Sequence, residues 1–131
     1  MSSVECLLKK VSDTQTPNSR SYFAATSAFR TGADSPRKFL ERCIGVIEEQ
    51  EARIGAFVET NLDGARKTAD EASERWKFGS PLSAIDGMPI GIKDIMETAD
   101  MGTEQGSPLF TGWQGGRDCA AVVALRNAGA V

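Results

Sequence analysis

The sequence predicts an α/β fold in which a series of helices is followed by a strand, a long loop and a further helix. Between residues 21 and 79, apolar residues recur at helical spacing. In residues 88–95 (MPIGIKDI), large apolar side chains alternate with other residues over most of the stretch, as in a half-buried strand. Nine of the 13 glycines lie between positions 79 and 129, so this part of the chain is richer in turns and loops.

Length and composition restrict the class of protein. The 131 residues fit one compact domain, and 40% hydrophobic residues suffice for a core. A net charge of −3 argues against electrostatic binding of nucleic acid. No apolar run reaches the about 18–20 residues of a membrane span, and the first residues lack the apolar core of a secretory signal. We therefore expect a cytoplasmic protein that binds neither nucleic acid nor a membrane.

The side chains available for chemistry are limited. Cys6, Cys43 and Cys119 are far apart and form no C-x-x-C pair, so neither a disulfide framework nor a metal site is indicated. The chain has no histidine, which excludes Ser-His-Asp and Cys-His catalytic sets within it. A base acting near neutral pH must then be a carboxylate or a lysine with a lowered pKa. We expect no cofactor and no metal.

The first helices have local start and stop signals. Residues 1–20 are rich in turn-forming residues and are expected to be a loose lead-in. Residues 21–31 are expected to form a short helix that Gly32 ends in a left-handed conformation. Ser35 and Pro36 provide the N-cap and first turn of a firmer helix, which should end near residue 50.

The next helix is expected over residues 61–78, after a short extended segment at residues 54–59. Thr60 with Asp63 resembles a capping arrangement. One narrow stripe of this helix is apolar, and the other faces carry charged pairs four residues apart, Glu71 with Arg75 among them. The charged faces therefore need no partner beyond solvent. The apolar stripe consists of Leu62, Ala65, Ala69, Ala72 and Trp76.

The second half of the chain contains the expected strand at residues 88–95. Pro89 suits the first position of a strand, where no ladder donor is needed. Residues 96–116 are expected to form a glycine-rich loop, and a loop of that length in a compact domain is usually functional or disordered. Asp118 is expected to cap a last helix that Gly129 closes.

Lys93 is the first candidate for chemistry. On an alternating strand, Gly91, Lys93 and Ile95 share one face, and Asp94 lies on the other. Gly91 leaves room for another backbone to approach the ammonium group. Flanking isoleucines would desolvate the amine, and a neutral lysine can act as a base or a nucleophile. From composition alone, however, a surface lysine on an edge strand paired with Asp94 is the favoured interpretation.

Four acids in the second half of the chain could form a carboxylate cluster for a metal. Their spacing matches no known ligand loop, so solvated loop acids are the favoured interpretation. These acids are Asp86, Asp94, Glu97 and Asp100.

Residues 80–131 carry a run of closely spaced motifs. The stretch PLSAIDGMPIGIKDIMETADMGTEQGSPLFTGW approximates the pattern P-L-x-G-I-P, alternating hydrophobic residues and K-D, then a T-x-G-M-x-T-like run and G-S. RDCAAVVALRNAGAV follows as a helix that ends in A-G-A. In these motifs and in its upstream helices, the chain resembles the amidase-signature family over about residues 30 to 131. It departs from the pattern at residues 84–87 (AIDG) and at Asp100, where the family commonly has glycine.

The resemblance implies a mechanism and a fold. In this family a strand lysine acts through a serine in a cis peptide on a nucleophilic serine, and Lys93 matches that lysine. The chain contains no Gly-Ser-Ser-Gly-Gly-like run that could hold the two serines. We therefore expect residues 21–131 to be the N-terminal part of a larger mixed-sheet amidase domain, helical over 21–79, with the lysine strand, loop and helix at 80–131. Expected supporting or pocket residues are Gly91, Asp94, Met101, Thr103, Gly106 and Ser107.

Three functional interpretations follow from the resemblance. The first is a fragment of an amidase that converts a small-molecule carboxamide to an acid and ammonia, contributing the lysine and inactive alone. The second is a non-catalytic, truncated interaction module that forms a homodimer or pairs with a complementing chain. The third is part of a glutamyl-tRNA amidotransferase A-type subunit, which would imply ATP and a multi-subunit complex.

Overall fold

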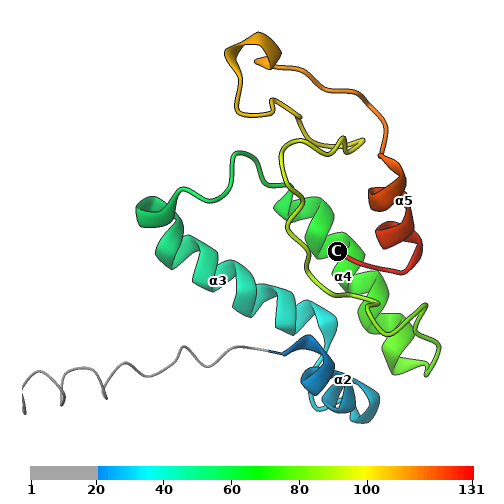
Figure 1. Cartoon of the computed structure of the whole chain (residues 1–131). Helices are drawn as coiled ribbons and strands as arrows, with labels where there is room; N and C mark the ends of the chain where they lie inside the picture. The colour runs from blue at the N-terminus through cyan, green and yellow to red at the C-terminus, as the bar shows by residue number, and fades with distance from the viewer. Residues whose placement is uncertain (1–20) are drawn as a thin grey trace, which may run out of the picture.

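The computed structural model describes residues 21–131, and the expected lead-in over 1–20 lies outside the described residues. Helices α3 and α4 lie side by side, and α2 packs against α4 at one end of the pair (Figure 1). The long loop after residue 95 projects from the end opposite to α2, and it leads into α5 (Figure 1). The elements are α2 (Tyr22–Thr31), α3 (Pro36–Ile54), α4 (Leu62–Lys77), the 3-10 helix η1 (Pro108–Phe110) and α5 (Ala120–Asn127).

The first helix ends and the second begins at the predicted local signals. The Ser21 and Ser35 hydroxyls accept hydrogen bonds from the backbone N–H groups of Ala24 and Lys38, respectively. Gly32 ends α2 with a φ of 75°. Helix α3 runs past its expected end to Ile54, and the left-handed Gly55 stops it. The expected extended segment at 54–59 is therefore partly helical, and its remainder is irregular coil.

Two predicted caps are wrong. Helix α4 is capped by Asn61, whose Oδ1 accepts the N–H of Gly64 at 2.9 Å, and not by Thr60. Helix α5 follows Cys119 and has no side-chain cap. Asp118 instead accepts the N–H of Ala99 at 2.8 Å and pairs with Arg126. Both errors arise because several adjacent residues are chemically able to cap, and the surrounding chain decides which one does.

The predicted strand at 88–95 does not appear as regular strand, and residues 21–131 contain no assigned strand. The α/β prediction is therefore not met by this part of the chain. Even so, the backbone of residues 88–90 is paired. Ile90 N–H donates to the Val131 carbonyl at 2.8 Å, and Val131 N–H donates to the Met88 carbonyl at 2.9 Å. This exchange is the hydrogen-bond pattern of two parallel strands at their first point of contact.

The core consists of two clusters between the helices. In the first, an aromatic set joins α2, α3 and α4, with Tyr22 and Phe39 in edge-to-face contact at 5.2 Å between ring centroids. In the second, Leu40 and Ile44 of α3 pack on Ala69 of α4. The predicted apolar stripe of α4 is thus confirmed as its buried face. The small alanines allow the two helices to approach closely.

Asp86 is fully buried, which makes the prediction of a solvated loop acid wrong for this residue. Its carboxylate receives Arg75 Nε at 2.9 Å and Nη2 at 2.6 Å, and the N–H of Leu82 at 3.0 Å. Its backbone carbonyl accepts the Trp76 indole N–H at 2.9 Å and the Tyr22 hydroxyl. A buried carboxylate is tolerated only when its oxygens are paired in this way.

The same contacts affect Tyr22. Burial, reinforced by the negative charge of Asp86, raises the pKa of the Tyr22 hydroxyl. The hydroxyl therefore stays protonated and available as a donor over the physiological range. It joins α2 to the turn that precedes residue 88.

The charged faces of α4 do have partners outside the helix, contrary to the prediction. Arg75 turns to Asp86, and Arg66 Nε binds Glu41 of α3 at 2.9 Å. Arg37 of α3 also binds Glu41, at 2.8 Å. Hydrogen bonds from Arg66 and then Arg37 lower the pKa of the Glu41 carboxyl. Because Glu41, Arg66 and Arg37 are only half-buried, their pairs orient the helices more than they stabilise them.

Among the described glycines, Gly129 is the one where an added Cβ atom would come closest to a neighbouring atom. It has a φ of 88°, and a Cβ atom there would overlap Oδ1 of the buried Asp86. We expect Gly129→Ala to lower the free energy of unfolding by more than about 2 kcal/mol, from backbone strain and from displacement of a paired carboxylate. Urea unfolding followed by circular dichroism measures the change.

Gly45 provides the matched control for this substitution. It lies within α3, and a Cβ atom there meets nothing within 4 Å. Gly45→Ala should stabilise the protein by about 0.5–1 kcal/mol through helix propensity. Equal effects of the two substitutions would contradict the proposed contact between Gly129 and Asp86.

Candidate functional site

The segment that carries Lys93 alternates in burial even though it is not a regular strand. Ile90, Ile92 and Asp94 are half-buried, whereas Gly91, Lys93 and Ile95 are exposed. The two-residue period predicted from the sequence is therefore confirmed. Ile90, Ile92 and Asp94 form the more buried side of the segment, and Lys93 lies on its exposed side.

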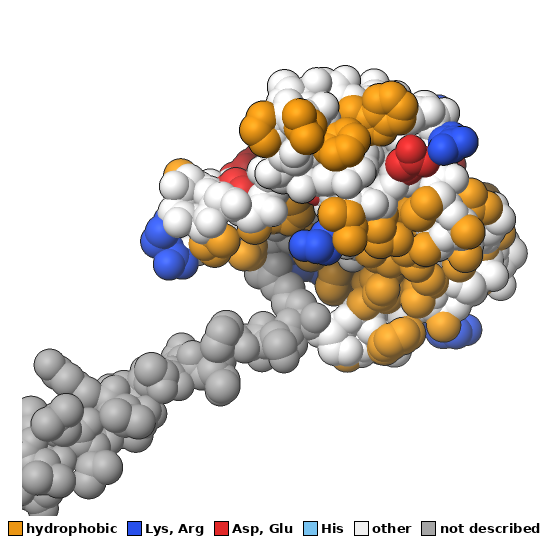
Figure 2. Space-filling model, turned by 45° about the horizontal axis from the view of Figure 1, so that its top comes forward, with side chains coloured by type: hydrophobic (Ala, Val, Ile, Leu, Met, Phe, Trp, Pro, Cys, Tyr) orange, Lys and Arg blue, Asp and Glu red, His pale blue; other side chains and the backbone are white. Residues whose placement is uncertain are grey.

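An open hollow of about 1040 Å³ lies between this segment, α3, α4 and the long loop. Lys93, Asp94 and Gly91 line it, together with Met101 and Gly106 from the loop. The wall on the helix side is apolar and includes Phe57, which is 43% exposed. Figure 2 shows hydrophobic side chains gathered over a broad part of one face of the molecule. Five of the seven predicted site residues thus lie around one hollow.

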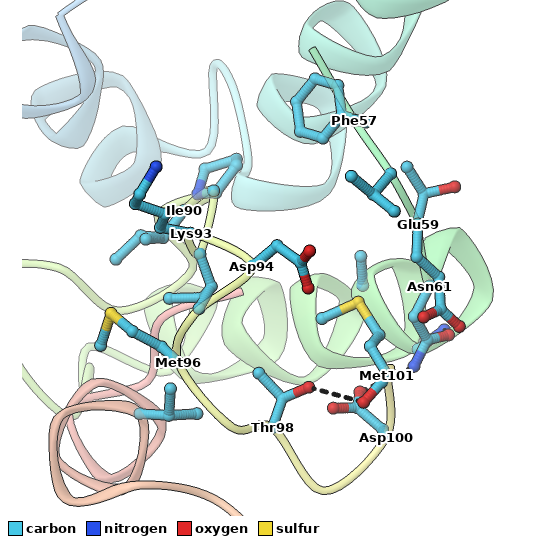
Figure 3. A pocket seen from close by; sticks show the side chains of 18 of the residues that line it. Phe57, Glu59, Asn61, Ile90, Lys93, Asp94, Met96, Thr98, Asp100 and Met101 are labelled. Carbon is cyan, nitrogen blue, oxygen red and sulfur yellow. Dashed lines mark hydrogen bonds between the residues drawn. The ribbon is translucent and has the colours of Figure 1, made fainter. Parts of the chain in front are cut away.

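Lys93 and Asp94 do not pair. Their side chains leave the backbone in different directions (Figure 3). Within residues 21–131, the Lys93 ammonium group forms no hydrogen bond or ion pair, and the side chain is exposed. The expected desolvation by flanking isoleucines is therefore not met here, because Ile95 is itself 58% exposed and a Cβ at Gly91 would face open space. The alternative of a Lys93–Asp94 ion pair is not met either.

Asp94 is engaged with the loop. Its Oδ1 accepts the N–H of Glu104 at 2.8 Å, and its Oδ2 accepts the N–H of Gly106 at 3.3 Å. Its backbone carbonyl accepts the N–H of Gln105 at 3.1 Å. The Asp94 carboxylate is thus bound by backbone N–H groups of the loop and not by the Lys93 ammonium group.

Two predicted pocket residues do not line the hollow. Thr103 is 1% exposed, and its N–H donates to the Trp113 carbonyl at 2.9 Å. Ser107 instead caps η1, where its hydroxyl accepts the N–H of Leu109 at 3.4 Å. Both residues organise the loop from within and do not face the space that a ligand would enter.

The other loop acids form separate pairs. Glu97 binds Arg117 at 3.0 Å. Asp100 binds Arg126, and it accepts a hydrogen bond from Asn61 at 2.8 Å. Its φ is not positive, so glycine is not required at this departure from the family pattern. Within residues 21–131, no group of three or more metal-binding side chains is placed to hold an ion.

The sequence analysis missed two polar residues at the entrance to α4. Glu59 accepts the N–H of Gly102, and Asn61 caps α4 while binding Asp100 (Figure 3). These contacts join the loop to the start of α4 across about forty residues of sequence. The capping preference of asparagine is the signal that indicates Asn61. Glu59 has no local signal.

No helix among residues 21–131 combines the length and the apolar character needed to cross a membrane.

Solved structures place this arrangement in a class of proteins. Native peptide amidase from Stenotrophomonas maltophilia matches with a TM-score of 0.79 and 25% identity, over 88% of this chain and 24% of that chain. A protein from a vestigial complex related to the origins of an s-triazine catabolic enzyme matches with a TM-score of 0.77 and 26% identity, over 86% of this chain and 25% of that chain. The described residues thus share the fold of part of an amidase.

The family follows from the sequence comparison. The Amidase family model matches residues 38–131, and the chain belongs to that family. The A-type subunit of the mitochondrial glutamyl-tRNA(Gln) amidotransferase of Xenopus tropicalis is 35% identical over 107 residues, which are 82% of this chain and 20% of the relative. Its counterpart in Chloroflexus aggregans is 33% identical over 108 residues, 82% of this chain and 22% of the relative. The chain spans about a fifth of the length of these relatives.

Thr103 allows a test of how the loop is packed. Its Oγ1 is buried without a hydrogen-bond partner among the described residues. We expect Thr103→Val, which removes the hydroxyl and preserves the shape, to be neutral or to raise the free energy of unfolding by about 1 kcal/mol. Thermal unfolding followed by calorimetry measures the change.

Thr98 provides the control for Thr103→Val. It is also buried, at 3% exposure, but its hydroxyl donates a hydrogen bond to the Met101 carbonyl at 3.4 Å. Thr98→Val should destabilise the protein by about 1 kcal/mol. Destabilisation by Thr103→Val as large as that by Thr98→Val would show that the Thr103 hydroxyl is bonded in solution.

Proposed function

We propose that this chain supplies the lysine general base and part of the pocket wall of an amide hydrolase. The observation that carries the proposal is the position of Lys93. It lies in the part of the sequence that matches the Amidase family, on the outer face of an alternating segment and at the edge of a hollow. The Asp94 carboxylate is bound by the loop and does not pair with Lys93. This arrangement favours a lysine amine that is available to a group outside these residues.

In this proposal the reaction needs two serines from outside the 131 residues. The Lys93 amine takes a proton, through one serine, from the hydroxyl of the other. The activated serine oxygen attacks the carboxamide carbon, and ammonia leaves with the transferred proton. Water then cleaves the acyl-serine ester to give the acid. A base without the hydroxyl that it activates has no turnover, so the chain alone is proposed to be inactive.

The exposure of Lys93 fits a site that is completed by polypeptide outside these 131 residues. A lysine becomes a useful base when desolvation favours its neutral form. Residues 21–131 leave the outer face of the lysine segment open, so we propose that further polypeptide covers it and continues residues 88–95 as a strand of a mixed sheet. This is the α/β arrangement expected from the sequence. A cytoplasmic location is part of the proposal, because three widely spaced cysteines suit a reducing compartment.

A second candidate function is suggested by the curated relatives, which are named as A-type subunits of glutamyl-tRNA(Gln) amidotransferases. In that case the ammonia would be transferred within a multi-subunit complex that uses ATP. The net charge of −3 gives no support for tRNA contact by this portion, so we rank a small carboxamide first as substrate. Ammonia release that depends on ATP and on other subunits would favour the amidotransferase.

The role of Lys93 is tested in a longer parent polypeptide that contains these 131 residues and the serines. Lys93→Ala should lower kcat for carboxamide hydrolysis by about 10²–10⁴-fold, the usual contribution of a general base. Ammonia release measures the rate. Lys67→Ala, on the exposed side of α4, is the control and should leave the rate unchanged. Near-normal activity of Lys93→Ala would remove Lys93 from the mechanism.

The chain alone provides a separate test. Purified residues 1–131 should release no ammonia from simple carboxamides, because the nucleophile is missing. If the chain is instead a non-catalytic interaction module, size-exclusion chromatography should show a homodimer or a complex with a longer chain. A stable monomer without a partner would contradict the module, and ammonia release at an enzymatic rate would contradict the missing nucleophile.

A further inference from the structure

Three consecutive backbone N–H groups of the long loop converge on Asp94. The N–H groups of Glu104 and Gly106 donate to the two carboxylate oxygens, and the N–H of Gln105 donates to the backbone carbonyl. No other side chain among residues 21–131 accepts bonds from two members of this triplet. Asp94 is thus the centre around which the loop folds back.

The backbone conformation of the loop explains why an anion is needed there. Gln105 and Gly106 have φ values of 56° and 64°, and Ser107 N–H donates to the Glu104 carbonyl at 2.9 Å. Two successive positive φ values are typical of a type I′ turn, and Gln105 is the only residue other than glycine with a positive φ between positions 21 and 131. Successive N–H groups in such turns point into one concavity that binds anions. Here the Asp94 carboxylate fills it.

The turn matters because it forms part of the rim of the hollow. Glu104, Gln105 and Gly106 line the hollow opposite the apolar wall. Glu104 Oε1 also accepts the N–H of Gly112 at 2.7 Å, so the position of the turn is passed on to the outer part of the loop. We call the hydrogen bonds of Asp94 to residues 104–106 the clamp. Since Asp94 follows Lys93 directly in the chain, the clamp fixes the position of the rim relative to Lys93.

We propose that Asp94 is a positioning residue that fixes the 104–107 turn as the pocket rim at a set place relative to Lys93. This proposal rests on the proposed role of Lys93 for its functional meaning. The clamp itself rests only on the contacts of Asp94. Asp94 does not act on the substrate. It determines the shape of the space that the substrate enters.

Amide hydrogen exchange of the 131-residue chain, followed by NMR, tests the clamp. In Asp94→Ala, exchange at Glu104 and Gly106 should accelerate about tenfold or more, as expected for the loss of bonds to a charged acceptor. Gln105 should change less, because its bond goes to the backbone carbonyl. In Asp94→Asn, which has the same size but only one accepting oxygen, one of the two amides should stay protected and the other should accelerate.

Asp118→Ala is the matched control for Asp94→Ala, since Asp118 holds the other end of the loop by accepting the N–H of Ala99. It should accelerate exchange at Ala99 and leave residues 104–106 unchanged. Unchanged exchange at Glu104 and Gly106 in Asp94→Ala would overturn the clamp. Full protection of both amides in Asp94→Asn would also overturn it, since that result is expected if the side chain only fills space.

Kinetics in the longer parent polypeptide test the positioning role. A displaced rim should raise KM at least about fivefold in Asp94→Asn while kcat changes by less than about twofold, because Lys93 remains in place. Loss of folded protein alone would lower the apparent kcat and leave KM unchanged, and that result would overturn the positioning role. If Lys93→Ala is active, the proposed function fails, yet the exchange experiment still decides whether Asp94 clamps the turn.

Discussion

The buried carboxylate of Asp86 is the interaction on which the rest of this structure depends. The Asp86 carboxylate binds Arg75 of α4 and lies close to Gly129 after α5, and the Asp86 backbone carbonyl accepts the hydroxyl of Tyr22 in α2. These three elements meet two residues before the lysine segment, residues 88–95. Since a buried charge is stable only with all its partners in place, the elements cannot shift independently. The N–H of Gly87 also donates to the Gly129 carbonyl at 2.7 Å, so the chain leaves this junction in a fixed direction.

The helices could be predicted because their signals are local. Ser35 and Pro36 start α3, Gly32 ends α2, and the alanine stripe identifies the buried face of α4. Asp86 could not be recognised in the same way. In sequence it is an acid in a turn, and its partner Arg75 looks like one more charge on a surface helix. What distinguishes the pair is burial, which depends on how α2, α4 and α5 pack, and no local pattern reports that packing.

The lysine segment shows that side-chain alternation can be predicted from local sequence, whereas strand pairing cannot. The predicted alternation agrees with the exposure of residues 90–95, although Asp94 and Ile95 lie in a hydrogen-bonded turn and not in extended backbone. Regular strand pairing was not found among the described residues, because a ladder needs partners from distant segments. Among the described residues, Val131 alone forms two backbone hydrogen bonds with the lysine segment, one to Met88 and one to Ile90. In the same way, the position of the glycine-rich loop agrees with the prediction. Asp94 was among the expected supporting residues, but its hydrogen bonds to the loop, and those of Glu59, follow only from the structure.

The proposed chemistry depends on separating two neighbouring charges. An acid next to a lysine favours the charged ammonium form, which is the wrong form for a base. The chain turns at residues 93–96, where the Met96 N–H donates to the Lys93 carbonyl at 2.9 Å, and the Lys93 and Asp94 side chains leave this turn in different directions (Figure 3). The loop N–H groups then hold the Asp94 carboxylate in place. The segment therefore delivers an amine without an internal counter-charge to the edge of a hollow. In the proposed function, these 131 residues set the position of Lys93 and its separation from the Asp94 carboxylate, and the proposed covering polypeptide is what would remove water from the amine.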